Sequence, residues 1–198
     1  MRIVTISVGK IEKVIMSGEG PGRTVKTAIN KHPVSEIATP VPIFVGALGL
    51  AQDEQADLTV HGGADKAVYV YPAEHYPFWE SELIQQAIES GPLAHGFFGE
   101  NLTVEGLREQ EVFVGDIWNI GEVELMVEAL REPCFKFNSK IGFDAAGPTM
   151  VRSARSGWYL SVLQPGVFKA GDEIVVIPGD RETSIADQNA LLKIKRRL

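Results

Sequence analysis

The sequence contains a single cysteine, Cys134, among its 198 residues, so an internal disulfide bond is excluded. It lacks any apolar run of the roughly 18–20 residues that a helix needs to cross a bilayer. The amino-terminal segment mixes charges into a strand-like pattern and has neither the apolar centre nor the cleavage site of a signal peptide. These absences predict a protein of the reducing cytoplasm that has no membrane partner.

Positive charge is scarce, since 19 lysines and arginines face 26 aspartates and glutamates, for a net charge of −7. Such a surface repels phosphate backbones, which argues against DNA or RNA as a partner. Local groups of cations can still hold a small anion. The basic residues to consider are Arg23, Lys26, Lys66, Arg131, Lys136, Arg152 and Arg155.

What the chain has in abundance is short, β-branched, alternating segments separated by glycine and proline. Alternation with a period of two predicts half-buried strands, and glycine-rich stretches such as residues 18–22 predict turns. We therefore predict a mostly β fold of the α+β class, a barrel or sandwich. The predicted strands are Arg2–Val8 and residues 41–45, 57–60, 67–71, 101–104, 112–120, 122–129, 158–163 and 173–177.

Helical spacing is rarer and predicts three helices, over residues 76–89, over residues 148–155, and from Ser184 onward. Ser184 and Asp187 form a plausible capping pair for the last helix. A linker over residues 178–182 predicts that this helix lies outside the barrel. The expected organisation is a β-barrel domain over residues 1–180 and a C-terminal helix over residues 181–198.

Cys134 is the first candidate for chemistry. It follows a predicted strand and a kink at Pro133, which indicates a rigid turn at the rim of a barrel. The thiolate is the reactive and metal-binding form of cysteine, and Arg131 and Lys136 can supply the positive field that stabilises it. The alternative is a small buried apolar side chain, which is the usual role of a free cysteine.

Two further motifs contain polar residues where loops meet strands. In the first, His61, Gly62 and Gly63 precede Asp65 and Lys66. Its glycines allow backbone N–H groups to approach an anion, its histidine can move protons, and its aspartate and lysine can hold a substrate. A hairpin turn explains the same residues.

In the second motif, Glu100 and Asn101 can bind a polar heterocycle, or can cap the backbone of their own loop. No pair of residues elsewhere has the spacing of a metal site. We therefore interpret His32, His75 and His95 as surface or satisfied histidines, and Tyr69, Tyr71, Tyr76 and Trp79 as core residues.

The order of these motifs along the chain is more specific than any one of them. The segments 53–57, 61–69 and 98–102 are followed by Gly115-Asp116 and by Arg131-Glu132-Pro133-Cys134 with Lys136. This series resembles a MOSC domain, named from the C-terminal part of molybdenum cofactor sulfurases, and is most similar to the stand-alone bacterial YiiM-like proteins. The resemblance runs from Ile3 to about Ile194.

The resemblance implies a MOSC-type β-barrel with peripheral helices that binds the molybdenum–molybdopterin cofactor, with Cys134 as a ligand of the metal. It implies reduction of N-hydroxylated compounds, in particular hydroxylaminopurine-type bases, to amines, independently of pyridoxal phosphate. A separate flavin reductase would supply the electrons. Thiolate sulfur is a suitable soft ligand for such a metal.

The resemblance also suggests roles for the other candidates. The anionic pterin would be held by Arg23, Lys26, Gly62, Gly63, Lys66, Arg131 and Lys136, and the substrate would be oriented or protonated by His61, Asp65, Glu100 and Asn101.

YiiM-like chains usually carry a three-helix extension after the barrel, whereas residues 184–198 leave room for about one helix at 1.5 Å per residue. The C-terminal helix is therefore interpreted as a truncated remnant, and docking of the electron donor, or a possible homodimer, can differ here. Two other functions stay open: a sulfur carrier or sulfurtransferase with a persulfide on Cys134, and a non-catalytic cofactor-binding module. A redox-inert barrel with a buried cysteine is the plainest alternative.

Overall fold

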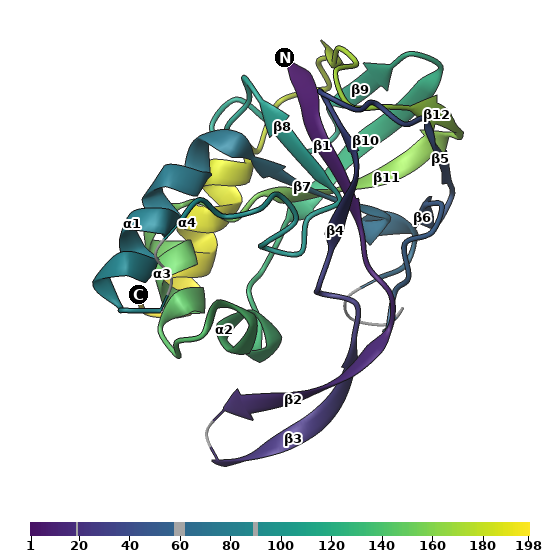
Figure 1. Ribbon diagram of the computed structural model, residues 1–198. Coiled ribbons are helices and arrows are strands. Elements are labelled where there is room, and N and C mark those ends of the chain that lie inside the picture. The colour runs from purple at the N-terminus through teal and green to yellow at the C-terminus, as the bar shows by residue number, and fades with distance from the viewer. Residues whose placement is uncertain (19, 58–61, 89–90) are drawn as a thin grey trace.

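A mixed eight-stranded sheet forms the body of the protein and curls into a half-barrel (Figure 1). The computed structural model describes residues 1–18, 20–57, 62–88 and 91–198. Strands β7 and β8 run parallel, and the other neighbouring strands of the described sheet run antiparallel. In order across the sheet, the strands are β13 (Val175–Ile177), β9 (Ile117–Ile120), β10 (Val123–Leu130), β11 (Trp158–Gln164), β7 (Val68–Pro72), β8 (Leu102–Glu105), β1 (Arg2–Val8) and β4 (His32–Glu36).

The predicted mostly β class is confirmed, and the alternating pattern has the expected cause. In β10, Val123, Leu125 and Val127 are buried, and the residues between them are partly exposed. The predicted strand over residues 112–120 was too long, because a turn at Gly115 delays β9 until Ile117. Of the predicted strand over residues 57–60, residues 58–60 lie outside the described residues.

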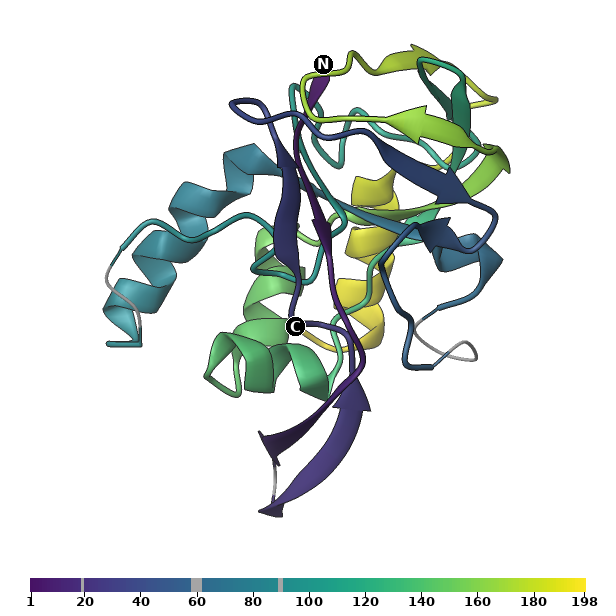
Figure 2. The same cartoon turned by 45° about the vertical axis from the view of Figure 1, so that its right-hand side comes forward.

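Two smaller sheets extend the body. One contains β5 (Ile43–Gly46), β6 (Gly49–Leu50) and β12 (Gly166–Phe168). The other is a hairpin of β2 (Glu12–Gly18) and β3 (Gly20–Thr27), which projects away from the barrel in both views (Figures 1 and 2). The sequence analysis missed these two strands. Burial in the hairpin does not follow hydrophobicity alone, since Ile15 is 74% exposed whereas Met16 is 4% exposed.

Four α-helices are present in the described residues, and three gather on one side of the sheet (Figure 1). None of the helices in this part of the chain has the length and apolar character needed to span a membrane. Helix α1 ends before the predicted residue 89, and α2, directly after Cys134, was not predicted. The helices are α1 (Tyr76–Gln85), α2 (Phe135–Ile141), α3 (Ala146–Ser153) and α4 (Ile185–Lys195).

The C-terminal helix begins as predicted, with a capping box in which Ser184 and Asp187 each satisfy the other's backbone N–H. The helix packs directly against the sheet and does not stand apart from it. Ile185 and Leu192 are buried in the main core of the sheet, and Gln188 accepts a hydrogen bond from the N–H of Leu130 at 2.7 Å. The helix sequence has no clear apolar stripe that would have predicted this packing, because its buried residues include the polar Asn189.

A second, aromatic core lies beneath α1 and α2, separate from the apolar core of the sheet. The indole of Trp79 donates to the hydroxyl of Tyr71 at 2.6 Å, and the centroid of the Trp79 ring lies 5.5 Å from that of Phe98. The prediction that Tyr69, Tyr71, Tyr76 and Trp79 are core residues is confirmed by their burial.

Candidate functional site

One pocket is lined by several of the candidate residues. It lies where the end of β3, the loop after β6, strands β7 and β11, and the turn from β10 into α2 meet. These segments are far apart in sequence and are joined by the curl of the sheet. The pocket is lined by Thr27, Ala28, Ile29, Lys31, Asp53, Glu54, Gln55, Ala56, Asp57, Lys66, Tyr69, Phe98, Gly99, Asn101, Arg131, Cys134, Lys136 and Tyr159.

Cys134 lies on the pocket wall and is partly exposed, so it is not the buried apolar side chain of the plain alternative. It is the extended residue that precedes α2, and its carbonyl oxygen accepts the N–H of Phe137 at 2.9 Å. Pro133 before it is buried. The thiol thus lies on the pocket at the start of α2, and a rigid turn at the barrel rim stays a prediction.

Arg131 lies on the same wall, with only 6% of its surface exposed. Its guanidinium lies 4.6 Å from the ring centroid of Phe137 and 5.5 Å from that of Tyr69. One nitrogen donates to the sulfur of Met150 at 3.6 Å, and the group also hydrogen-bonds the hydroxyl of Tyr159. Within the described residues no carboxylate pairs with it, so this buried charge retains capacity for an anion.

The charge of Arg131 also acts on its neighbours. It interacts favourably with a thiolate at Cys134. Burial raises the pKa of Tyr159, and Arg131 opposes that shift only in part. The Tyr159 hydroxyl therefore stays protonated at neutral pH.

The pocket lining also contains a buried ion pair that the sequence analysis missed. Lys31 Nζ lies 2.7 Å from both carboxylate oxygens of Asp53, and the two side chains are 8% and 5% exposed. Asp53 also accepts from the N–H of Gly9 at 2.7 Å and from Asn101 Nδ2 at 2.9 Å. The Oδ1 of Asn101 accepts the N–H of Tyr69 at 3.1 Å. Only Asp53 carried a sequence signal, as the first residue of the 53–57 motif, and a lone lysine in a polar loop carries none.

The other predicted cofactor residues divide between the pocket and its surroundings. Lys66 and Lys136 line the pocket, whereas Lys26 is exposed and contributes only its backbone carbonyl, which accepts from Lys136 Nζ at 3.3 Å. His61 and the side chain of Arg23 lie outside the described residues.

The two glycines of the glycine motif contact the side chain of Gln55. The N–H of Gly63 donates to Gln55 Oε1 at 2.8 Å, and a side chain at position 62 would collide with the same oxygen. Gly62 and Gly63 do not line the pocket, and Asp65 is exposed outside it. Residues Ala64–Lys66 form a short 3-10 helix after the glycines, and a role for these residues in anion binding stays a prediction.

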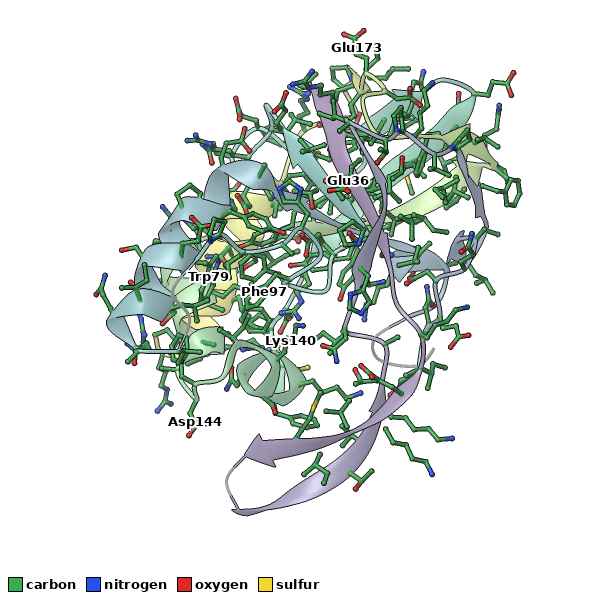
Figure 3. All side chains as sticks on the ribbon, viewed as in Figure 1. Glu36, Trp79, Phe97, Lys140, Asp144 and Glu173 are labelled. Carbon is green, nitrogen blue, oxygen red and sulfur yellow. The ribbon has the colours of Figure 1, made fainter. Side chains whose placement is uncertain are left out.

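Glu100 is fully buried and does not line the pocket. Its carboxylate accepts from the N–H groups of Gly96 and Phe98 at 2.8 and 3.0 Å, and from the hydroxyls of Thr103 at 3.0 Å and Tyr76. Burial raises its pKa, and these hydrogen bonds oppose the rise. It holds the loop in which the ring of Phe97 lies 5.3 Å from Lys140 Nζ (Figure 3).

The remaining candidates are satisfied away from the pocket. His75 pairs with Glu109 at 2.8 Å, and His95 hydrogen-bonds Thr5 at 2.6 Å. Arg155 stacks on Phe78 at 4.1 Å, and Arg152 contacts Thr149 on its own helix. The described part of the chain contains no cluster of three or more metal-ligating side chains.

Comparison with known proteins places this geometry in context. The MOSC domain family model matches residues 57–175. The uncharacterized protein YflK of Bacillus subtilis (strain 168) is 34% identical over 190 residues, or 96% of this chain and 79% of that protein. A protein named reductase from Gibberella moniliformis is 33% identical over 176 residues, which cover 88% of this chain but 29% of that protein.

Among solved structures, YiiM from Geobacillus stearothermophilus matches with a TM-score of 0.74 at 33% identity, covering 100% of this chain and 86% of that one. The segment matched by the family model includes Arg131, Cys134 and Tyr159, whereas Lys31 and Asp53 precede it.

Proposed function

This chain belongs to the MOSC domain family, and from that premise we propose that it is a molybdenum-cofactor-dependent reductase of N-hydroxylated compounds, hydroxylaminopurine-type bases in particular. The observation that carries the proposal is one pocket wall with a partly exposed thiol, Cys134, beside a buried guanidinium, Arg131, that has no carboxylate partner in the described residues. The relative named reductase supports an oxidoreductase role.

The residues present fit the implied cofactor. A thiolate at Cys134 is a soft ligand of the kind that a sulfur-bound metal accepts. Arg131 offers a buried site for a phosphate or another anion of the pterin, since guanidinium pairs well with such groups. Lys66 and Lys136 add positive charge on the same pocket. When bound, the cofactor would supply a metal that exchanges an electron pair with the substrate's N–O bond.

The chain's own contribution is to bind and orient. Arg131 is fixed between the rings of Tyr69 and Phe137, so little side-chain entropy is lost when it takes up an anion. Tyr69 and Tyr159, with ring centroids 5.4 Å apart, give the pocket an aromatic surface suited to a flat heterocycle. A separate flavin reductase is the proposed source of electrons.

The test is molybdenum and pterin analysis of protein made in a host that synthesises the cofactor. Wild type is expected to contain up to one metal per chain, and Cys134→Ser is expected to lose most of it. Ser139→Ala on α2, outside the pocket, is the matched control and retains the metal. Reduction of hydroxylaminopurine with an artificial electron donor then tests the activity. Wild type without metal and pterin contradicts the proposal.

A sulfur carrier or sulfurtransferase is the second candidate, because the exposure of Cys134 and its cationic neighbour suit a persulfide equally well. Intact mass measurement separates the two. A reducible adduct of about one sulfur atom on Cys134, in protein that contains no metal, favours sulfur transfer. A protein that retains the cofactor but reduces no N–O bond is instead a binding module.

A further inference from the structure

Lys31 has a donor that the chain does not use. Its ammonium carries three N–H groups, and the described residues provide acceptors for two of them, both on Asp53. The side chain is 8% exposed and lines the pocket. A buried donor without an acceptor is costly, so the third N–H is suited to an oxygen atom that enters the pocket with a ligand.

The direction of this donor is fixed by neighbours on three segments. Asp53 binds Lys31 with both oxygens and is itself held by the N–H of Gly9 and the amide of Asn101. Asn101 is in turn held by the backbone of Tyr69 in β7 and of Ser7 in β1. Because every member is anchored to the sheet, Lys31 has little freedom to turn elsewhere. Preorganised donors of this kind are effective at sites where charge develops.

We propose that Lys31 is a catalytic residue of this pocket that donates its third N–H, and then its proton, to the hydroxyl oxygen of an N-hydroxylated substrate. Asp53 and Asn101 are positioning residues that hold Lys31 in place. This inference rests on the proposed function and assigns the proton donor that the reaction requires.

The proposed reaction conserves atoms and electrons. The N–O bond breaks and its electron pair leaves with the oxygen, which takes the proton of Lys31 and departs as water. The nitrogen receives an electron pair from the two-electron reductant and a proton from solvent, and becomes the amine. Lys31 then regains its proton from solvent. In total, one hydroxylamine, two electrons and two protons give one amine and one water.

The electrostatics of the site support proton donation. Burial lowers the pKa of Lys31, whereas Asp53 and, more weakly, Glu100 raise it, and the outcome is a lowered pKa. The ammonium therefore gives up its proton more readily than an exposed lysine would. These two carboxylates are the charges that act on it.

The first test compares two ligands that differ by one oxygen, hydroxylaminopurine and adenine, by calorimetry on the cofactor-containing protein without reductant. Wild type is expected to bind the hydroxylamine about tenfold more tightly than the amine, the usual gain from a charged donor. Lys31→Met is expected to remove this preference while binding adenine normally. Lys169→Met, at an exposed pair with Asp172, makes the same chemical change elsewhere and keeps the preference.

The second test measures kcat and KM. Loss of a general acid is expected to lower the kcat of Lys31→Met roughly a hundredfold with unchanged molybdenum content. If Lys31→Met does not fold because Asp53 is left unpaired, Lys31→Met/Asp53→Asn replaces the ion pair with neutral groups and is measured in the same two ways.

Each result supports or overturns the role of Lys31, the proposed reductase activity, or both. A ligand preference or a kcat that Lys31→Met leaves at the wild-type level overturns the role of Lys31, even where wild type reduces the substrate. A wild-type preference that Lys31→Met removes, in a protein that reduces nothing, supports the Lys31 contact and overturns the proposed reductase. Failure of wild type to bind either ligand overturns both.

Discussion

Glu100 and Arg131 are both buried charges, and the structure uses them in opposite ways. Glu100 accepts hydrogen bonds from two backbone N–H groups and two hydroxyls of its own chain. Arg131 is enclosed by aromatic rings and a thioether and pairs with no carboxylate of the described residues. Glu100 lies outside the pocket, and Arg131 lines it.

The difference indicates what each charge is for. A buried charge whose partners all belong to the chain stabilises a local structure, here the loop before β8. A buried charge with unused donors costs stability unless a ligand completes it. Burial alone therefore does not identify a functional charge, and the number of partners within the chain does.

The largest effect is expected at Glu100. Glu100→Ala leaves several buried donors without an acceptor and should lower the free energy of unfolding by about 3 kcal/mol or more. Urea denaturation measures the loss. Glu122→Ala, at an exposed site, should change stability by less than about 0.5 kcal/mol. A loss at Glu100 no greater than at Glu122 would break the comparison.

The opposite result is expected at Arg131. Arg131→Met replaces an uncompensated buried charge with an apolar side chain among Phe137, Tyr69 and Met150, and should change stability by less than about 1 kcal/mol. Bound molybdenum and pterin should instead fall about tenfold, since a charged hydrogen bond to an anion is lost. Loss of stability with cofactor content intact would show that Arg131 is structural.

The protonation of Glu100 makes its contribution to the free energy of unfolding depend on pH. Burial raises its pKa above the ordinary value of 4.5, so the folded state binds its proton more tightly than the unfolded state does. Its stabilising contribution is complete below the unfolded pKa and is lost as pH rises through the folded pKa. The stability advantage of wild type over Glu100→Gln should therefore shrink as pH rises above 4.5. An advantage that grows with pH would show that the pKa of Glu100 is lowered in the fold.

The smallest effect is expected at Lys136, a half-exposed cation of the same pocket. Water and salt screen such a charge, so Lys136→Met should weaken cofactor retention only about twofold. The small loss should disappear in high salt, whereas that of Arg131→Met should persist. Equal losses at both positions would mean that burial does not distinguish these two cations.

The sequence predicted the site unevenly, for reasons visible in individual residues. Cys134 was recognisable because its type is rare and its flanks are cationic, and the pocket wall confirms its exposure. Lys31 was not, because one lysine in a loop has no pattern until Asp53, 22 residues later, binds it. Glu100 was placed among catalytic candidates because a carboxylate at a loop end has the same sequence signature whether it faces a ligand or its own backbone.

What the sequence determined by itself was the class of fold and the order of the motifs, since alternation, turn residues and the Ser184 cap are local properties of neighbouring residues. Tertiary structure alone decided which motifs share a pocket, where the C-terminal helix packs and which buried charges remain incomplete. Each of these depends on the curl of the sheet, which brings residues 31, 53, 101 and 131 together. A pattern within one segment cannot report a partner that another segment supplies.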